Sequence, residues 1–532
     1  MSKGFKKYYP HILLLLTFGL LLFINLFFQD HWLDSDMAAE MMFSKLLTET
    51  GHIFATPDWY YSTEFRFLYT HLVMAPLFRI FTDWHTIRTI TNLVFYGLLL
   101  VSYFYFLKPL KVSAKAAVLT SLFLFLPFSE TMMTHMQIGN TYLSHVIIIF
   151  FCFGVFLRLC GLLSQKKGQK LIHLVFYLFL TLVCGISGIR YLLALQCPLV
   201  LAAFLFCLRS ESFGQLRRTP AKEQLTALLR CREFVYLFYS LVGFASSIVG
   251  YGINAFYISR QYSFQTYDAT NFISVYDGVF FDRLQNALGA LLMLFGYIPN
   301  KGVISLRGVI SVISFVFIGI FVYCTVMCFK RLKNERFFVV LFLVTAFLVN
   351  CFAFVFTTST MVPRYYITVF MFVLPVLAFY FQSEKLVFDK AVVGLLLAGC
   401  LFLSTGKTVL SEITADKNAS KRPVAEFLAE NGYHFGYATY TNANIITELT
   451  DGMVEIANVW DPDALNDFKW SSPAKYYKES YHTGSVFLLL TKEEANTFSD
   501  AEAVKTGEVI YDDGSYMVFL FDSVESLKAC GA

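Results

Sequence analysis

The chain has 532 residues, of which 57% are hydrophobic, 18% aromatic and only 15% charged, and its mean hydropathy is +0.58. Because soluble domains are about one-quarter charged, this composition excludes an ordinary soluble protein and indicates a polytopic α-helical membrane protein. The formal net charge of +4 is small, and we expect no nucleic-acid partner. The 11 cysteines show neither CxxC nor zinc-ligand spacing, so they predict no disulfide framework.

Clusters of basic residues between the apolar runs predict the topology. Lys3, Lys6 and Lys7 precede the first run, so the positive-inside rule places the N-terminus in the cytoplasm. No small-residue cleavage site follows this run, which is therefore predicted to remain as the first span. We predict about 11 transmembrane helices. They are residues 12–28, 87–107, 116–128 and 142–159, a run ending near Gly188, a run ending near Leu208, residues 234–258 and 309–328, a run ending near Phe356, a run beginning near Arg364, and residues 391–403.

The first outer loop, residues 29–86, follows the first span. Within it, residues 38–50 predict a short helix that ends at Gly51. Residues 67–81 are apolar but include a proline and an arginine, and they predict a helix lying in the membrane interface. If this segment were a span, the basic cluster after the next span would lie outside, against the positive-inside rule.

Two further connections are long. Residues 209–232 predict a basic cytoplasmic link, and residues 259–308 predict a second large outer loop. The link contains Arg217, Arg218, Lys222 and Arg230 between its terminal arginines. The charged residues of the second outer loop are Arg260, Asp268, Asp277, Asp282, Arg283, Lys301 and Arg307.

The composition changes at residue 410, which divides a transmembrane domain, 1–409, from a C-terminal domain, 410–532. The C-terminal region has 20 Asp and Glu against 9 Lys and Arg and no run long enough to span. An odd number of spans places it outside the cytoplasm, and its pattern predicts a small α/β domain. The predicted elements are helices at 422–431 and 443–449, strands at 434–440, 453–459 and 486–490, and a hairpin at 508–522 that turns at Asp512-Asp513-Gly514.

Two carboxylates, Asp34 and Asp36, open the first outer loop just past the first span. A carboxylate at the bilayer surface can deprotonate an acceptor hydroxyl during sugar transfer from a lipid-linked donor. On an extended segment the two side chains would share a face, whereas on a helix they diverge. The alternative interpretation is a solvated turn in which Asp36 is the N-cap of the following helix. The motif alone leaves both interpretations open.

Arg190 and Arg364 lie at the predicted outer ends of spans, where cations are normally scarce. A guanidinium can bind a phosphate bidentately, so both are candidates for stabilising a phosphate leaving group, with interfacial snorkelling as the alternative. Arg66 and Arg88 belong to the same category with less support. The remaining candidates are Glu64, which also fits a local ion pair with Arg66, and Glu130, His135 and Asn140 in the outer loop 129–140. A lone histidine such as His135 is more typical of a structural donor than of a metal ligand.

Three segments together form a recognisable pattern. The first runs from Leu33-Asp34-Ser35-Asp36 through Thr50-Gly51 to Trp59-Tyr60-Tyr61-Ser62-Thr63-Glu64. The second is Pro363-Arg364-Tyr365-Tyr366, and the third is Gly185-Ile186-Ser187-Gly188-Ile189-Arg190 with Pro198. These segments resemble the first outer loop, the Arg-Tyr element near the lipid-phosphate site and the mid-chain glycine-rich helix break of GT-C fold glycosyltransferases. That superfamily includes the protein mannosyltransferase and aminoarabinose transferase groups.

The resemblance implies a GT-C-like fold, a polyprenyl-phosphate sugar donor and a catalytic acidic residue in the first loop. The common Asp-Glu dipeptide is replaced here by Asp-Ser-Asp, and Asp36 fits the pattern better than Asp34 because an alanine-containing helix follows it. Arg364, Tyr365 and Arg190 would then hold the donor phosphate. The acceptor would be an extracytoplasmic glycan, a lipid-linked glycan or a protein. Some members use a divalent cation, so the resemblance allows Mg²⁺ or Mn²⁺ although the residues do not require it.

We therefore expect an inverting sugar transfer at the outer face of the cytoplasmic membrane. A polysaccharide polymerase or ligase also remains open, because such enzymes use outer-loop arginines late in the chain and residues 259–308 contain several cations. A lipid or polysaccharide transporter would predict charged residues within spans and an internal repeat, and the sequence shows neither pattern. A non-catalytic partner in surface assembly is the remaining alternative.

Overall fold

The computed structural model describes residues 3–161, 166–210, 231–265, 270–276, 278–302, 304–383, 387–478 and 480–531. Outside these ranges lie the link residues Arg217, Arg218, Lys222 and Arg230 and the loop residues Asp268 and Asp277, as does the side chain of Arg307. The chain forms two compact units. The first consists of Met1–Leu21, Val94–Phe256 and Asp268–Leu410, and the second of Leu22–Leu93, Tyr257–Tyr267 and Ser411–Ala532.

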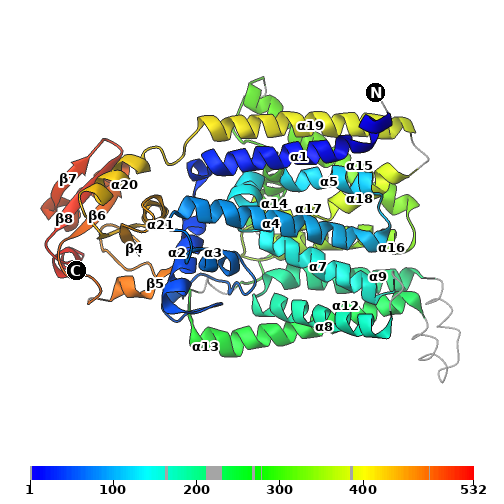
Figure 1. Cartoon of the computed structure of the whole chain (residues 1–532), viewed down its shortest axis with the longest axis horizontal. Coiled ribbons are helices and arrows are strands. Elements are labelled where there is room, and N and C mark those ends of the chain that lie inside the picture. Colours follow the sequence, from blue (N-terminus) through cyan, green and yellow to red (C-terminus); the bar gives the residue numbers. More distant parts are fainter. Residues whose placement is uncertain are drawn as a thin grey trace. The chain divides into compact units, whose positions relative to one another are not determined.

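Long apolar helices run side by side through the first unit (Figure 1). Within the described residues, nine helices have the length and hydropathy of a membrane span, so the chain is a multi-pass membrane protein. The two other predicted spans form shorter apolar helices, α5 (Ala114–Phe125) and α7 (Leu143–Leu159). The nine candidate spans contain α1 (Lys3–Phe27), α4 (Trp84–Leu107), α8 (Lys167–Ile186), η4 (Leu192–Gln196) with α9 (Cys197–Arg209), α12 (Arg232–Ile253), α15 (Leu306–Arg331), α16 (Asn334–Val355), η6 (Pro363–Tyr366) with α17 (Ile367–Phe370) and α18 (Val373–Gln382), and α19 (Val387–Thr414).

A sharp bend follows the third predicted span, and the predicted outer loop 129–140 is largely helical. α5 and the helical stretch Glu130–Ile138 meet at an angle of 92°. Pro127 lies two residues beyond the end of α5, and proline both lacks the N–H that a helix needs and restricts the residue before it. The stretch after the bend consists of α6 (Glu130–Met132) and a π-helical turn, η3 (Met133–Ile138). It carries the candidate residues Glu130 and His135.

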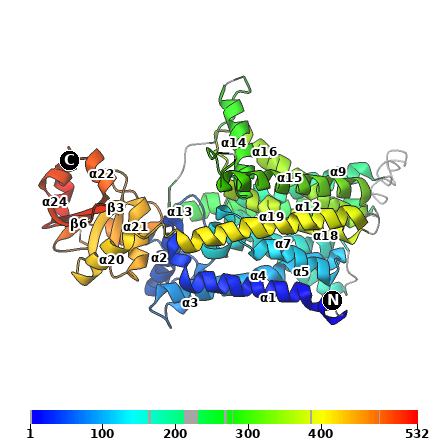
Figure 2. The same ribbon diagram turned by 90° about the horizontal axis from the view of Figure 1, so that it is seen from above.

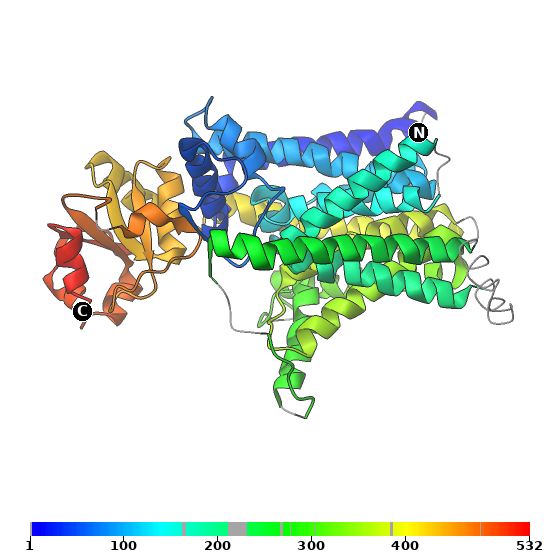
Figure 3. The ribbon, with the colours of Figure 1, turned by 90° about the horizontal axis from the view of Figure 1, so that it is seen from below.

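Helices α8 and α12 pack with unusually short separation because small residues line their contact (Figure 3, with α12 in green). A Cβ atom added at Gly185 would lie 1.9 Å from the carbonyl oxygen of Ser247, and one added at Gly250 would lie 2.1 Å from that of Leu182. The Ser247 hydroxyl donates a hydrogen bond to the Thr181 carbonyl at 2.7 Å. This contact fixes the end of α8, and the chain then continues to Arg190.

The predicted second outer loop contains α13 (Ser259–Gln261), β2 (Ser263–Phe264) and α14 (Gly278–Leu294). The helix α14 belongs to the first unit and stands across its long helices (Figure 2).

The second unit contains two sheets. A small sheet has the order β2-β1-β5, in which β1 (Trp59–Tyr61) is parallel to β2 and antiparallel to β5 (Ser472–Pro473). A larger sheet has the order β4-β3-β6-β8-β7. Its strands are β3 (Phe435–Thr439), β4 (Glu455–Val459), β6 (Val486–Thr491), β7 (Glu508–Asp512) and β8 (Tyr516–Phe521). β3 is parallel to β4 and β6, whereas β8 is antiparallel to β6 and β7.

Helices α20 (Lys421–Glu430) and α21 (Tyr440–Leu449) accompany the larger sheet, and their apolar side chains Val424, Leu428 and Ile446 share one core with its strands. All strands and both longer helices predicted for residues 410–532 are present. The short helices α22 (Lys492–Thr497), α23 (Glu502–Thr506) and α24 (Val524–Ala529) were not predicted.

Besides β1, the first outer loop contains two α-helices of the second unit. α2 (Ser35–Thr50) ends at Gly51, whose φ of 71° lies in the left-handed region, as predicted. Residues 67–81 contain α3 (His71–Leu77), whose 7 residues are too few to cross a membrane. The prediction that this segment is no span is therefore confirmed.

Candidate functional site

Asp34 ends the extended approach to α2 and caps that helix. Its backbone is extended, with φ −117° and ψ 169°, and its side chain accepts a hydrogen bond from the Met37 N–H at 2.9 Å. This is N-cap geometry, because the carboxylate satisfies one of the unpaired amides of the first turn. The interpretation of Asp36 as the N-cap was therefore wrong by two residues, since the extended backbone continues only to Asp34.

Asp36 lies within the first turn of α2 and is half-buried. Its Oδ1 accepts a hydrogen bond from the Tyr440 hydroxyl at 2.8 Å. Within the described residues, Oδ2 accepts no hydrogen bond. The side chain lines a cavity of about 60 Å³ in the second unit, and the same cavity is lined by Glu64 and Arg66. The structure thus brings together three of the residues predicted from the first outer loop.

One turn further along α2, Glu40 lines the same cavity and is 7% exposed. Its Oε1 accepts hydrogen bonds from Arg66 and from the Tyr69 hydroxyl, the latter at 2.7 Å, and its Oε2 accepts one from the Thr70 hydroxyl at 3.1 Å. Burial raises the pKa of Glu40 to about 7, against the opposing effects of Arg66 and Tyr69. Arg66 therefore has an internal carboxylate partner, and its guanidinium also stacks on the Tyr69 ring.

Aromatic side chains complete the wall of this cavity. The Trp59 and Tyr61 rings both pack against Phe43, and the His71 ring meets Phe43 edge-on. His71 is buried, and burial lowers its pKa to about 3, so the ring is neutral. The lining therefore combines aromatic walls with a few convergent polar groups, which is the kind of lining found in small-molecule sites.

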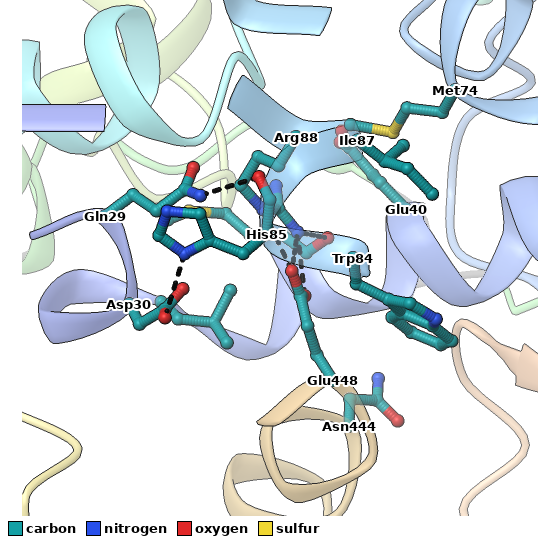
Figure 4. A network of polar contacts seen from close by, with 12 residues as sticks. Gln29, Asp30, Glu40, Met74, Trp84, His85, Ile87, Arg88, Asn444 and Glu448 are labelled. Carbon is teal, nitrogen blue, oxygen red and sulfur yellow. Dashed lines mark hydrogen bonds and ion pairs between the residues drawn. The ribbon is translucent and has the colours of Figure 1, made fainter. Parts of the chain in front are cut away.

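Arg88, which like Arg66 was a candidate with less support, forms an ion pair away from the cavity. It is 1% exposed and forms a bidentate ion pair with Glu448 of α21, with Nη2 at 2.6 Å from Oε1 and 2.7 Å from Oε2 (Figure 4). Nη2 also donates to the carbonyl oxygen of Met37 at 3.0 Å. Arg88 is therefore no phosphate ligand but part of the structural support of α2.

A second group of predicted residues meets in the first unit. The Arg190 guanidinium lies 4.9 Å from the Tyr142 ring centroid and 5.5 Å from that of Tyr365, and Arg364 lies 6.0 Å from the Tyr365 ring. Both arginines are half-buried. Within the described residues, Arg364 has no carboxylate partner. The two cations and Tyr365 thus form one cluster at the start of the span that begins at Pro363.

The backbone explains how Arg190 reaches this cluster. α8 ends at Ile186, and Gly188 takes φ 106°, which only glycine adopts readily, before the chain enters the π-helical turn η4 (Leu192–Gln196). This is the predicted glycine-rich helix break.

The loop 129–140 supplies the other predicted residues of the first unit. His135 is half-buried, its Nδ1 is 2.7 Å from the Thr141 hydroxyl, and its ring meets that of Tyr142, the residue that Arg190 also contacts. Asn140 is buried and adopts a left-handed φ of 63° where α7 begins. Glu130 is exposed in the first turn of α6, which packs against the segment Pro363–Tyr366.

The described residues contain no group of three or more His, Cys, Asp or Glu side chains that could hold a metal ion. These residues therefore offer no ligand set for the divalent cation that the resemblance allows.

Sequence reasoning missed Glu40 and Tyr440 as members of the site. Glu40 carried a signal, because it lies four residues after Asp36 on a predicted helix and such residues share a face. For Tyr440 the sequence contained no indication of a contact with Asp36, since the two residues are separated by 404 residues.

No protein-family model matches the chain, and no curated protein sequence matches it. Among solved structures, the chain is similar to ArnT from Cupriavidus metallidurans in the apo state, with 10% sequence identity, a TM-score of 0.57 and coverage of 98% of both chains. It is also similar to ArnT from Cupriavidus metallidurans bound to undecaprenyl phosphate, with 12% identity, a TM-score of 0.56 and coverage of 99% of both chains. At this level of identity the likeness shows the fold. The chain has the GT-C fold, as predicted.

Proposed function

We propose that this protein is an inverting glycosyltransferase that moves a sugar from a polyprenyl-phosphate donor to an acceptor outside the cytoplasm. The observation that carries the proposal is the Asp36 carboxylate, which lines a cavity with aromatic walls while Tyr440 engages one of its oxygens. The second support is the fold, because a solved structure of the same fold is bound to undecaprenyl phosphate. Fold likeness alone does not assign an activity, so the site bears the argument.

In the proposed reaction, Asp36 Oδ2 accepts the proton of the acceptor hydroxyl. The acceptor oxygen then bonds to the anomeric carbon from the face opposite the phosphate, so the configuration inverts. The bond from the anomeric carbon to the phosphate oxygen breaks, and polyprenyl phosphate leaves with the electron pair. Asp34 does not serve as the base, because its carboxylate caps α2.

Arg364 and Arg190 stabilise the charge that develops on the leaving phosphate. A guanidinium can bind two phosphate oxygens at once, and both residues lie against Tyr365. Further along the span that begins at Pro363, Tyr366, Phe370 and Val373 line an apolar cavity of about 250 Å³ in the first unit. The apolar lining of this cavity suits the first part of the donor's prenyl tail.

The proposed orientation follows the basic clusters. The N-terminus lies in the cytoplasm, and residues 410–532 lie outside the cytoplasmic membrane, where they cover the acceptor side of the site or recruit the acceptor. The acceptor is an envelope glycan, a lipid-linked glycan or a protein.

The test is the glycan composition of the cell envelope in a null strain that carries the wild-type gene, Asp34→Asn, Asp36→Asn or the double variant. Asparagine caps helices as well as aspartate does, so Asp34→Asn is a matched control for the loss of a carboxylate. We expect wild type and Asp34→Asn to restore one missing sugar, and both variants that lack Asp36 to fail at equal protein levels. Full restoration by Asp36→Asn and by the double variant would overturn the proposal and favour a ligase that uses Arg283.

A further inference from the structure

Helix α21 of the C-terminal region presents three polar side chains at intervals of four residues: Tyr440, Asn444 and Glu448. Residues four apart lie one above the other on the same face of a helix. Asn444 and Glu448 are buried, and Tyr440 is half-buried. Figure 4 shows Asn444 and Glu448 projecting from the same side of α21. A polar row on a buried helix face needs specific partners, because unpaired polar groups are costly there.

This row engages three successive residues at the start of α2, two of them directly and the third through Arg88. The Tyr440 hydroxyl donates to Asp36 Oδ1 at 2.8 Å, and Asn444 Nδ2 donates to the Ser35 carbonyl at 3.4 Å. Glu448 binds Arg88, whose Nη2 donates to the Met37 carbonyl. The row on α21 therefore holds the residue before Asp36, the Asp36 side chain and the residue after it.

The segment that leads into α2 is held by the same part of the chain. Asn418 is 1% exposed, and its Nδ2 donates to the carbonyl oxygens of Asp30 and Leu33, both at 2.9 Å. The C-terminal region thus fixes the backbone immediately before Asp34 as well as the first turn of α2.

We propose that α21 is a positioning element of the catalytic centre, in which the Tyr440 hydroxyl holds Asp36 Oδ1 so that Oδ2 faces the acceptor hydroxyl. The proposal rests on the assignment of Asp36 as the general base. Such a clamp contributes to the rate because a base must be held within a fraction of an ångström of its productive position. The C-terminal region then does more than cover the acceptor side, since without it the base is not oriented.

The chemistry of Tyr440 suits this role. Burial and the neighbouring Asp36 carboxylate raise the pKa of Tyr440 well above its ordinary value, so the phenol stays protonated and remains a donor. A donor to a carboxylate favours the ionised form, which is the form that accepts a proton. The Tyr440 ring also meets Phe468 edge-on, and a phenylalanine at this position keeps that contact.

The test compares Tyr440→Phe with Tyr516→Phe in the full chain. Tyr516 donates its hydroxyl at 3.0 Å to Asn442, another residue of α21, so the control also removes a hydroxyl that contacts this helix but spares Asp36. Membranes of the complemented null strain are used after the lipid-linked sugar pool has been labelled in the cells with a tritiated sugar. Passage of the label from lipid to glycan is followed between pH 5 and 9.

We expect Tyr440→Phe to lower the rate about 10- to 100-fold and to move the acid limb of the pH–rate profile to higher pH, because the ionised base loses a donor. Tyr516→Phe should keep the wild-type rate and profile. In the Asp36→Asn background, Tyr440→Phe should cause no further loss, since the two residues act as one unit.

Two results would overturn the inference. One is a wild-type rate and pH profile for Tyr440→Phe while Asp36→Asn is inactive, which would remove the positioning role and leave the proposed function intact. The other is an equal loss at every pH in Tyr440→Phe and Tyr516→Phe, which would show that either hydroxyl only supports the fold of α21. A wild-type rate for Asp36→Asn would instead overturn the proposed function itself.

Discussion

At the scale of single residues, two aspartates that are two positions apart have different surroundings because the backbone changes between them. The Asp34 backbone is extended, and its carboxylate accepts a hydrogen bond from the Met37 amide. The Asp36 backbone is helical, and its side chain lines the cavity that Glu40 and Arg66 also line. A carboxylate that already caps the N-terminus of a helix is a poor proton acceptor for a substrate. Position within the first turn therefore separates a structural carboxylate from a candidate base.

Glu40 gives the stability of the second unit a defined pH dependence. Its pKa rises from 4.5 to about 7 on folding, so the folded state retains this proton after the unfolded chain has lost it. The contribution of Glu40 to stability is thus complete below about pH 4.5 and is lost as pH rises through about 7. We expect the stability of Glu40→Gln relative to wild type to increase between pH 5 and pH 8, by at most about 3 kcal/mol.

Thermal unfolding of both purified proteins in detergent across this range measures the difference. His71 has the opposite effect, because its pKa falls from 6.5 to about 3 on folding and its contribution is lost as pH falls. It is present in both proteins and cancels from the difference. A gap between Glu40→Gln and wild type that stays constant from pH 5 to pH 8 would contradict the raised pKa of Glu40.

The sequence predicted Asp34, Asp36, Arg190 and Arg364 as candidates because each lies at a recognisable place, next to the end of an apolar run. It could not separate Asp34 from Asp36, since the first helical residue depends on the cap geometry of a few atoms. It also could not show that Arg66 pairs with Glu40, 26 residues away, because that contact requires α2 and the following loop to fold together.

At the scale of elements, α2 depends on α21 and on the first turn of α4. The ion pair of Arg88 with Glu448 links α4 to α21. Arg88 also donates a hydrogen bond to the Met37 carbonyl of α2. Both charges are almost completely buried, with side-chain exposures of 1% and 6%. Each charge therefore relies on the other, because a lone charge in this place has neither water nor a counter-ion.

Glu448→Gln should lower stability by about 3 to 5 kcal/mol, because it leaves the Arg88 guanidinium buried without a carboxylate. Thermal unfolding in detergent measures the loss. The double variant Arg88→Met, Glu448→Leu should recover much of it, since a well-packed apolar pair often replaces a buried ion pair without cost.

The matched control is Glu49→Gln, which breaks the half-exposed pair of Lys45 and Glu49 on α2, where the two charged atoms are 4.0 Å apart. Solvated pairs of this kind contribute little, so its melting temperature should match that of wild type. A melting temperature for Glu448→Gln as high as that of Glu49→Gln would show that Arg88 finds another partner.

At the scale of the whole molecule, the membrane helices could be predicted because hydropathy is a local property of the chain. Their bounds were less accurate: α19, for example, is Val387–Thr414 rather than 391–403, and α5 ends at Phe125, two residues before Pro127. The strands β3, β4, β6, β7 and β8 followed from alternation and turn residues for the same reason. The sequence did not indicate which segments of the chain make up each of the two units. Residues 22–93 join residues 411–532 in one compact unit through contacts such as that of Tyr440 with Asp36, which no local pattern encodes.

In the proposed reaction, donor binding and proton transfer rely on different units, because Arg190 and Arg364 belong to the first unit and Asp36 to the second. We expect Arg190→Ala and Arg364→Ala each to weaken the binding of undecaprenyl phosphate to the purified protein about 10- to 100-fold, the effect of losing a hydrogen-bonded charge. Asp36→Asn should bind this lipid as wild type does while failing to restore the envelope sugar. Native mass spectrometry with added undecaprenyl phosphate gives the affinities.

Arg336→Ala is the control within the first unit, because the Arg336 guanidinium donates to the backbone carbonyls of Leu110 and Lys111. It should leave lipid binding unchanged. Wild-type affinity in Arg364→Ala and Arg190→Ala would place the phosphate elsewhere. Equal weakening by Asp36→Asn would show that the base and the phosphate site are not separable functions. The expected pattern instead assigns recognition of the lipid phosphate to the arginines that follow Gly188 and Pro363, and assigns the chemistry to the helix that Asp34 caps.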